Sequence, residues 1–134
     1  MSWYAIAQHH LKNPDACTST RVYREADPME SGELVLWRDP DGLVAGFELS
    51  HAPFPRRHEY LLRWRRGEQP KVGEVDTSRS KFAMIPTARF ARQPGRHAVT
   101  DLTGYFEQNA TALEPTERDQ VAGVLREAAS LAVD

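Results

Sequence analysis

The chain has 134 residues, of which 40% are hydrophobic and 27% are charged, and its formal net charge is −2. This size and composition suit a single folded domain and exclude a wholly disordered chain. The longest apolar runs fall short of the roughly 20 residues that span a bilayer. A lone Cys17 excludes an internal disulfide and a zinc site built on paired thiols.

Two compositional features bear on where the protein works. The first seven residues lack the basic start and long apolar stretch of a secretory signal peptide, so we expect a cytoplasmic protein. Of the 17 basic residues, 14 are Arg and 3 are Lys. This bias is typical of GC-rich codons, and it hints at a bacterial source without indicating a mechanism.

The N-terminal quarter carries the weakest structural signal. Residues 2–11 fit a short helix or a short strand almost equally well, because their apolar positions follow no clean period. Residues 12–19 are rich in Asn, Pro, Asp, Thr and Ser, which is a loop composition. A short strand is expected over residues 20–25.

A β-hairpin is the strongest local signal. Residues 34–37 are rich in β-formers and apolar at every position, which predicts a strand covered on both faces. Residues 43–50 alternate apolar and polar positions, as in a half-buried strand. Between the two strands, Asp39 to Gly42 has the composition of a β-turn, so we interpret Asp39 and Asp41 as turn formers.

Three more strands are expected in the middle of the chain. Residues 59–65 alternate, with Tyr60 and Trp64 on one face and Arg63 and Arg65 on the other. A Gly- and Pro-containing turn leads back through residues 71–76. Residues 82–85 form a further apolar segment, which ends at Pro86.

The last third changes to a helical period. A first helix is expected to begin at Thr100 or Asp101 and to end before Pro115. A second helix is expected from Thr116, because Thr116 and Asp119 have the spacing of a capping box. Strands first and helices last predict an α+β fold, with an antiparallel β-meander of four to five strands and two C-terminal helices packed on one face. We expect one domain over residues 1–134.

Charge is distributed unevenly along the chain. Residues 1–55 carry a net charge of −4, residues 56–97 carry +7, and residues 98–134 carry −5. Alternation places Arg63 and Arg65 on the strand face away from the aromatic residues, so a basic sheet face is expected. The candidate binding residues are Arg56, Arg57, His58, Arg63, Arg65, Arg66, Lys71, Arg79 and Lys81.

Arginine offers a planar set of donors that suits carboxylates and phosphates. The favoured hypothesis is therefore a small non-enzymatic binding or interaction domain, with an anionic ligand or an acidic protein surface as its partner. A first alternative is nucleic-acid binding, although the slightly acidic pI of about 6.2 argues against it. A simpler interpretation is that the acidic C-terminal helices neutralise the basic block through weak surface pairs.

An enzymatic alternative uses His51, His58 and nearby arginines in a cleft near residues 51–58. His9 and His10 are adjacent, a spacing that does not place two ligands around one metal, so neither a metal nor a cofactor is expected. The tryptophans Trp3, Trp37 and Trp64 are expected in the core. Self-association through an exposed strand edge is a further alternative.

Overall fold

The computed structural model describes residues 3–6, 19–26, 31–52, 59–76, 87–90 and 95–132, which form one antiparallel sheet and two helices. The strands are β1 (Trp3–Ile6), β2 (Ser19–Glu25), β3 (Ser31–Arg38), β4 (Val44–Ala52), β5 (Glu59–Arg65), β6 (Lys71–Asp76) and β7 (Thr87–Phe90). The helices are α1 (Arg96–Asn109) and α2 (Pro115–Leu131), joined by the short 3₁₀ helix η1 (Ala110–Ala112). Neighbouring strands in the sheet are neighbours in the sequence throughout.

The predicted α+β class is confirmed, with a meander first and two helices after it. The sheet is larger than the four to five strands expected. β2 confirms the short strand expected over residues 20–25, β1 extends the sheet at the N-terminal edge, and β7 extends it at the other edge beyond Pro86. The strand expected over residues 82–85 and most of the loop expected over residues 12–19 lie outside the described residues, and Ser19 already belongs to β2.

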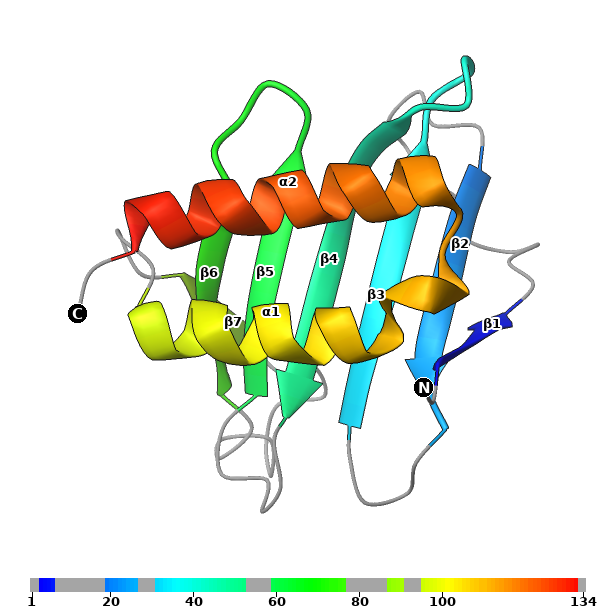
Figure 1. Ribbon diagram of the computed structural model, residues 1–134. Helices are drawn as coiled ribbons and strands as arrows, with labels where there is room; N and C mark the ends of the chain where they lie inside the picture. The colour runs from blue at the N-terminus through cyan, green and yellow to red at the C-terminus, as the bar shows by residue number, and fades with distance from the viewer. Residues whose placement is uncertain are drawn as a thin grey trace.

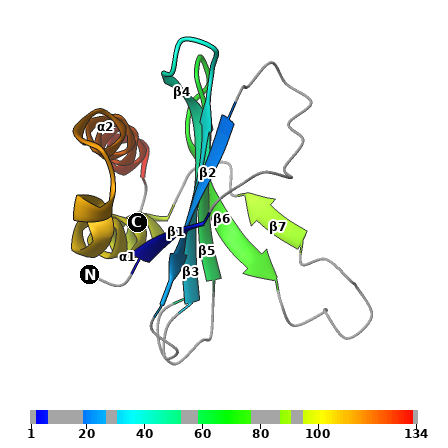
Figure 2. The same ribbon diagram turned by 90° about the vertical axis from the view of Figure 1, so that its right-hand side faces the viewer.

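The molecule has two layers. Both helices run across the strands on the same side of the sheet (Figure 1). Seen edge-on, β6 and β7 curve toward the other side of the sheet, away from the helices (Figure 2). On that side Val22 and Leu61 are buried, whereas most other described side chains of β3, β4 and β5 are partly or fully exposed. We call the helix-packed side the covered face and the other side the open face. Within the described ranges, neither helix is long and apolar enough to cross a membrane.

The covered face holds the core because strand alternation collects its apolar residues there. The register aligns Tyr23, Leu34, Leu49, Leu62 and Val72 in one row across five strands. All five side chains are buried and belong to the core cluster. The helices add their own apolar stripes, which are Ala98, Val99, Leu102, Tyr105 and Phe106 from α1 and Val121, Val124, Leu125 and Ala128 from α2.

The turn between β3 and β4 forms as its composition indicates. Asp39 Oδ1 accepts hydrogen bonds from the backbone N–H groups of Asp41 (2.9 Å) and Leu43 (3.0 Å). Gly42 has a φ of 84°, a conformation that glycine adopts without strain. These contacts are consistent with Asp39 as a turn former.

Both helices begin earlier than their sequences suggested. α1 starts at Arg96 after Gly95, because Ala98 and Val99 pack into the core and extend the helix by a turn. α2 starts at Pro115. Proline is favoured at the first helical position, since its missing N–H has no partner there in any case.

The capping box predicted at Thr116 and Asp119 is therefore wrong. It lies two residues earlier, at Glu114 and Glu117, with a bond from the Glu114 backbone N–H to Glu117 Oε1 at 3.4 Å.

Two of the three tryptophans match the expectation of core packing. Trp3 and Trp64 are buried among the core residues. Trp37 lies on the open face, where it is only partly buried, so that expectation is wrong for this residue. The prediction that residues 34–37 are covered on both faces is confirmed only in part, because Leu34 and Leu36 are fully buried while Val35 and Trp37 on the other face are partly exposed.

Candidate functional site

The structure describes four of the nine candidate binding residues. Three of them, Arg63, Arg65 and Lys71, point to the open face. Arg66 lies in the turn that follows β5. The candidates that lie outside the described residues are Arg56, Arg57, His58, Arg79 and Lys81.

Alternation along β5 separates the arginines from the aromatic residues. Tyr60 and Trp64 are buried in the core on the covered face, as expected. Arg63 and Arg65 therefore point the other way. Lys71 on β6 is directly opposite Arg63 in the register and joins them on the open face. Arg65 and Lys71 are exposed, and Arg63 is partly exposed.

Some of these cations have carboxylate partners within the sheet and its turns. Arg63 Nε lies 2.7 Å from Glu48 Oε1 on the neighbouring strand β4. Arg66 Nη1 lies 2.7 Å from Asp39 Oδ2, and its Nη2 donates to the Val44 carbonyl at 2.6 Å. The Arg66 hydrogen bond holds the pKa of Asp39 below its usual value. The open face is thus basic but not uniformly so.

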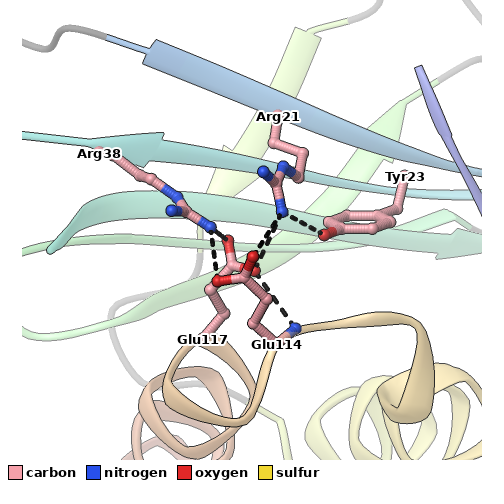
Figure 3. A network of polar contacts seen from close by, with 5 residues as sticks. All are labelled: Arg21, Tyr23, Arg38, Glu114 and Glu117. Atoms are coloured by element: carbon pink, nitrogen blue, oxygen red, sulfur yellow. Dashed lines mark hydrogen bonds and ion pairs between the residues drawn. The ribbon is translucent and has the colours of Figure 1, made fainter. Parts of the chain in front are cut away.

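The carboxylates at the start of α2 contact a different pair of arginines, and Figure 3 shows this network. Glu117 lies 2.5 Å from Arg38 Nη2 and 3.5 Å from Arg21 Nη1. Glu114 lies 3.5 Å and 3.6 Å from the same two nitrogens. Glu117 is only 2% exposed, so its ion pair with Arg38 is largely buried at the contact between helix and sheet.

This network bears on the proposal that acidic helices neutralise the basic block. Arg21 and Arg38 come from β2 and β3, in the acidic N-terminal third of the chain. The described pairs of the block itself, at Arg63 and Arg66, are made by strand and turn carboxylates. In the part of the chain that the structure describes, α2 therefore binds arginines of the covered face, and the sheet lies between it and Arg63.

The opposite end of the open face is acidic. Glu33 on β3 and Glu59 on β5 lie there, with Arg24 Nε 3.1 Å from Glu33 Oε2. They border a hollow of about 350 Å³, lined by Arg24, Glu25, Ser31, Gly32, Glu33, Ser50 and Glu59. Burial, together with the nearby charge of Glu33, raises the pKa of Glu59. Two carboxylates are thus crowded in a partly desolvated place.

His51, the centre of the enzymatic alternative, lies under α1 on the covered face. Its Nδ1 is 2.7 Å from Asp101 Oδ2, and its ring stacks on Tyr105 with centroids 3.9 Å apart. Its Nε2 is buried and has no hydrogen-bond partner among the described residues. A substrate cannot reach that nitrogen in this conformation, so the pair docks α1 on β4. His58 lies outside the described residues.

A second polar network anchors α1 one turn further along the helix, at Tyr105. Tyr105 Oη accepts a hydrogen bond from Trp3 Nε1 and donates one to Glu25 Oε2, both at 2.7 Å. Neither this network nor the partnership of His51 with Asp101 was predicted. Their members are 50 to 102 residues apart in the sequence, and no local pattern links them.

No group of three or more potential metal ligands occurs in the described ranges. A shallow hollow of about 560 Å³ beside the start of α1 is lined by Arg96, His97, Thr100 and Asp101. Cys17, His9 and His10 lie outside the described residues. Comparisons with protein-family models, with curated proteins and with solved structures gave no match to this chain.

Proposed function

We propose that this chain is a non-enzymatic binding domain that holds an acidic partner on the open face of its sheet. One observation carries the proposal: β5 and β6 bring Arg63, Arg65 and Lys71 together on the sheet face away from the core and the helices. A row of positive side chains on a rigid sheet attracts negative groups and orients them. The arginines also offer two donors at once to a carboxylate.

The composition of the face favours a protein partner over a nucleic acid. Glu48 on β4 lies directly opposite Arg63 and forms an ion pair with it. Its negative charge would repel a phosphate backbone at this place. Trp37 and Val35 leave apolar surface partly exposed beside the cations. Tryptophan and arginine are enriched where proteins bind proteins, and they contribute most of the binding energy there.

The experiment reverses the charge of the two exposed cations, in the variant Arg65→Glu with Lys71→Glu. Binding is measured by fluorescence titration against poly-L-glutamate, a probe for acidic protein surfaces, at low ionic strength. We expect the dissociation constant to rise by about tenfold or more, because reversed charges turn attraction into repulsion. The matched control, Arg118→Glu with Arg126→Glu on α2, makes the same change in net charge and is expected to leave binding unaltered.

Two outcomes contradict the proposal. Equal losses in both variants would mean that net charge alone drives binding, and no binding by the wild type would leave the face without a role. A single-stranded oligonucleotide serves as the second probe. Tighter binding to it than to poly-L-glutamate, with a steep loss at higher salt, would point to nucleic acid instead. Thermal melts of all variants show whether each remains folded.

A further inference from the structure

Apolar side chains lie at the basic end of the open face, close to the turn between β3 and β4. Trp37 on β3 is partly exposed there, and so is Val35, two residues before it on the same face. Leu43, which directly precedes β4, is 59% exposed. The next residue, Val44, belongs to the core, so alternation directs Leu43 to the open side. We call Val35, Trp37 and Leu43 the apolar patch.

A bulge in β4 lies next to this patch. The register between β3 and β4 shifts after Trp37, and Ala45 is the extra residue. Because of this residue, Gly46 belongs to the open face although Val44, two positions earlier, points into the core. Bulges re-aim side chains and are frequent beside functional sites.

The ring of Trp37 packs on Gly46, which is directly opposite it. Gly46 is buried, and a Cβ atom there would lie 3.4 Å from Trp37 Cε3 and 2.8 Å from the Trp64 carbonyl oxygen. The indole is thus held on the sheet, with part of its surface exposed. A rigid tryptophan loses little conformational freedom on binding, and tryptophan is enriched among the residues that dominate interface energies.

Contacts between two turns fix the edge of the apolar patch. Arg66, which follows β5, bonds Asp39 Oδ2 at 2.7 Å and the Val44 carbonyl at 2.6 Å. Its backbone N–H donates to the Ala45 carbonyl at 2.9 Å. The turn that carries Leu43 is therefore joined to β5. A surface that is already ordered costs little to order when a partner binds.

The accessible part of the open face is small. Val22, Ala52 and Leu61 on this face are already buried. β6 and β7 also curve toward this side (Figure 2). The side chains beside the apolar patch that remain partly or fully exposed are Glu48, Arg63, Arg65 and Lys71. Such a surface suits a short segment of a partner and leaves no place for a second folded layer.

We propose that the acidic partner binds here as an extended segment, in which an aromatic residue packs on Trp37 and Leu43 and a carboxylate pairs with Lys71. This inference rests on the proposed function and names the chemistry of its partner. Aromatic pairs contribute binding energy beyond the area that they bury. Glu48 already pairs with Arg63, so the exposed Lys71 gives this part of the face its positive charge, which is complementary to a carboxylate.

The sheet geometry predicts how far apart the aromatic residue and the carboxylate stand in the partner. From β3 to β6 there are three strand spacings, and Lys71 is level with Val35, two residues from Trp37. At about 4.8 Å per strand and about 3.4 Å per residue, Trp37 and Lys71 are roughly 16 Å apart. An extended chain covers this distance with about four to six residues.

Two dye-labelled peptides of serine and glutamate test the proposal on the whole chain by fluorescence anisotropy. One carries a single phenylalanine about five residues from a pair of glutamates, and the other has serine in place of the phenylalanine. We expect the wild type to bind the phenylalanine peptide at least about tenfold more tightly. Trp37→Ala is expected to lose this preference and to bind both peptides as weakly as the wild type binds the serine peptide.

Two further variants control for folding and for position. Leu43→Ser changes a side chain that is 59% exposed, so the fold is expected to tolerate it, and the preference for phenylalanine should fall by about threefold. Tyr4→Ala is the matched control, because it removes a ring that is 49% exposed on β1, and it should keep the full preference.

The outcomes separate this inference from the proposed function. Equal binding of both peptides by the wild type, or a preference that survives in both Trp37→Ala and Leu43→Ser, overturns the aromatic anchor. So does an equal loss in Tyr4→Ala. If Arg65→Glu with Lys71→Glu still loses binding to poly-L-glutamate in these cases, the proposed function stands and its partner is recognised by charge alone. A wild type that binds neither peptide nor poly-L-glutamate overturns both proposals.

Discussion

The two faces of the sheet both carry arginines, and they use them differently. On the covered face, Arg21 and Arg38 lie against Glu117, which is 2% exposed, so these charges join helix to sheet. On the open face, Arg63 and Arg65 stand on the solvent side of the same sheet. Successive residues of a strand point to opposite faces of the sheet. Whether an arginine joins the helices or faces away from them therefore depends on its place in this alternation, not on the region of the sequence that contains it.

The largest effect on stability is expected when an arginine on each face is replaced by methionine. Arg38→Met leaves the Glu117 carboxylate buried, with only Arg21 nearby at 3.5 Å. We expect it to lower the free energy of unfolding by about 3 kcal/mol, since a buried carboxylate that loses its nearest cation is costly. Arg63→Met removes a partly exposed pair and is expected to cost at most about 1 kcal/mol. Urea denaturation at neutral pH measures both.

A double variant checks the reason for that difference. Arg38→Met with Glu117→Leu removes both buried charges and replaces them with apolar groups. It is expected to recover much of the lost stability, because hydrophobic replacements of buried pairs are often neutral. It should remain below the wild type, because Glu117→Leu also removes the capping-box bond from the Glu114 N–H. Equal losses for Arg38→Met and Arg63→Met would show that burial of Glu117 does not distinguish the two faces.

The features predicted correctly from the sequence are those that depend only on neighbouring residues. The alternation of Tyr60 and Trp64 with Arg63 and Arg65 needs only one strand, and the structure confirms it. The predicted start of α1 is wrong because Ala98 and Val99 are held in the helix by core packing, which no local sequence motif indicates. Pro115 predicts the end of one helix, and in the structure it is also the first residue of the next.

The contacts of the candidate site depend even more on residues that are far apart in the sequence. Glu117 resembles a solvated helix charge in the sequence, and only its contacts with β2 and β3 reveal a buried ion pair. The sequence predicts Thr100 or Asp101 as the start of the first helix, whereas Asp101 contacts His51 from within α1. The acidic hollow requires β3, β4 and β5 to be placed side by side. Interactions across the sheet depend on register, which no segment specifies alone.

The next effect probes how closely α1 lies on the covered face. A Cβ atom at Gly32 would overlap the Tyr105 hydroxyl, so Gly32→Ala forces the ring out of its place. We expect a loss of about 1 to 3 kcal/mol, as for other overpacked sites. Gly104→Ala, in α1 with open space around its Cβ, is expected to gain about 0.5 to 1 kcal/mol. Thermal melts of the two variants should therefore shift in opposite directions, and an unchanged melt for Gly32→Ala would show that Tyr105 does not rest on β3.

The smallest effect concerns the turn at the basic end of the open face and appears as a pH dependence. Because Arg66 lowers the pKa of Asp39, the ionised carboxyl stabilises the fold at neutral pH. This contribution is lost as the pH falls through the lowered pKa, where the carboxyl becomes neutral. Asp39→Asn should therefore lower the urea midpoint at neutral pH, and its difference from the wild type should shrink below about pH 4. Asp41→Asn, an exposed change in the same turn, is the control. A difference for Asp39→Asn that stays constant with pH would mean that the side chain acts only through its hydrogen bonds to the turn.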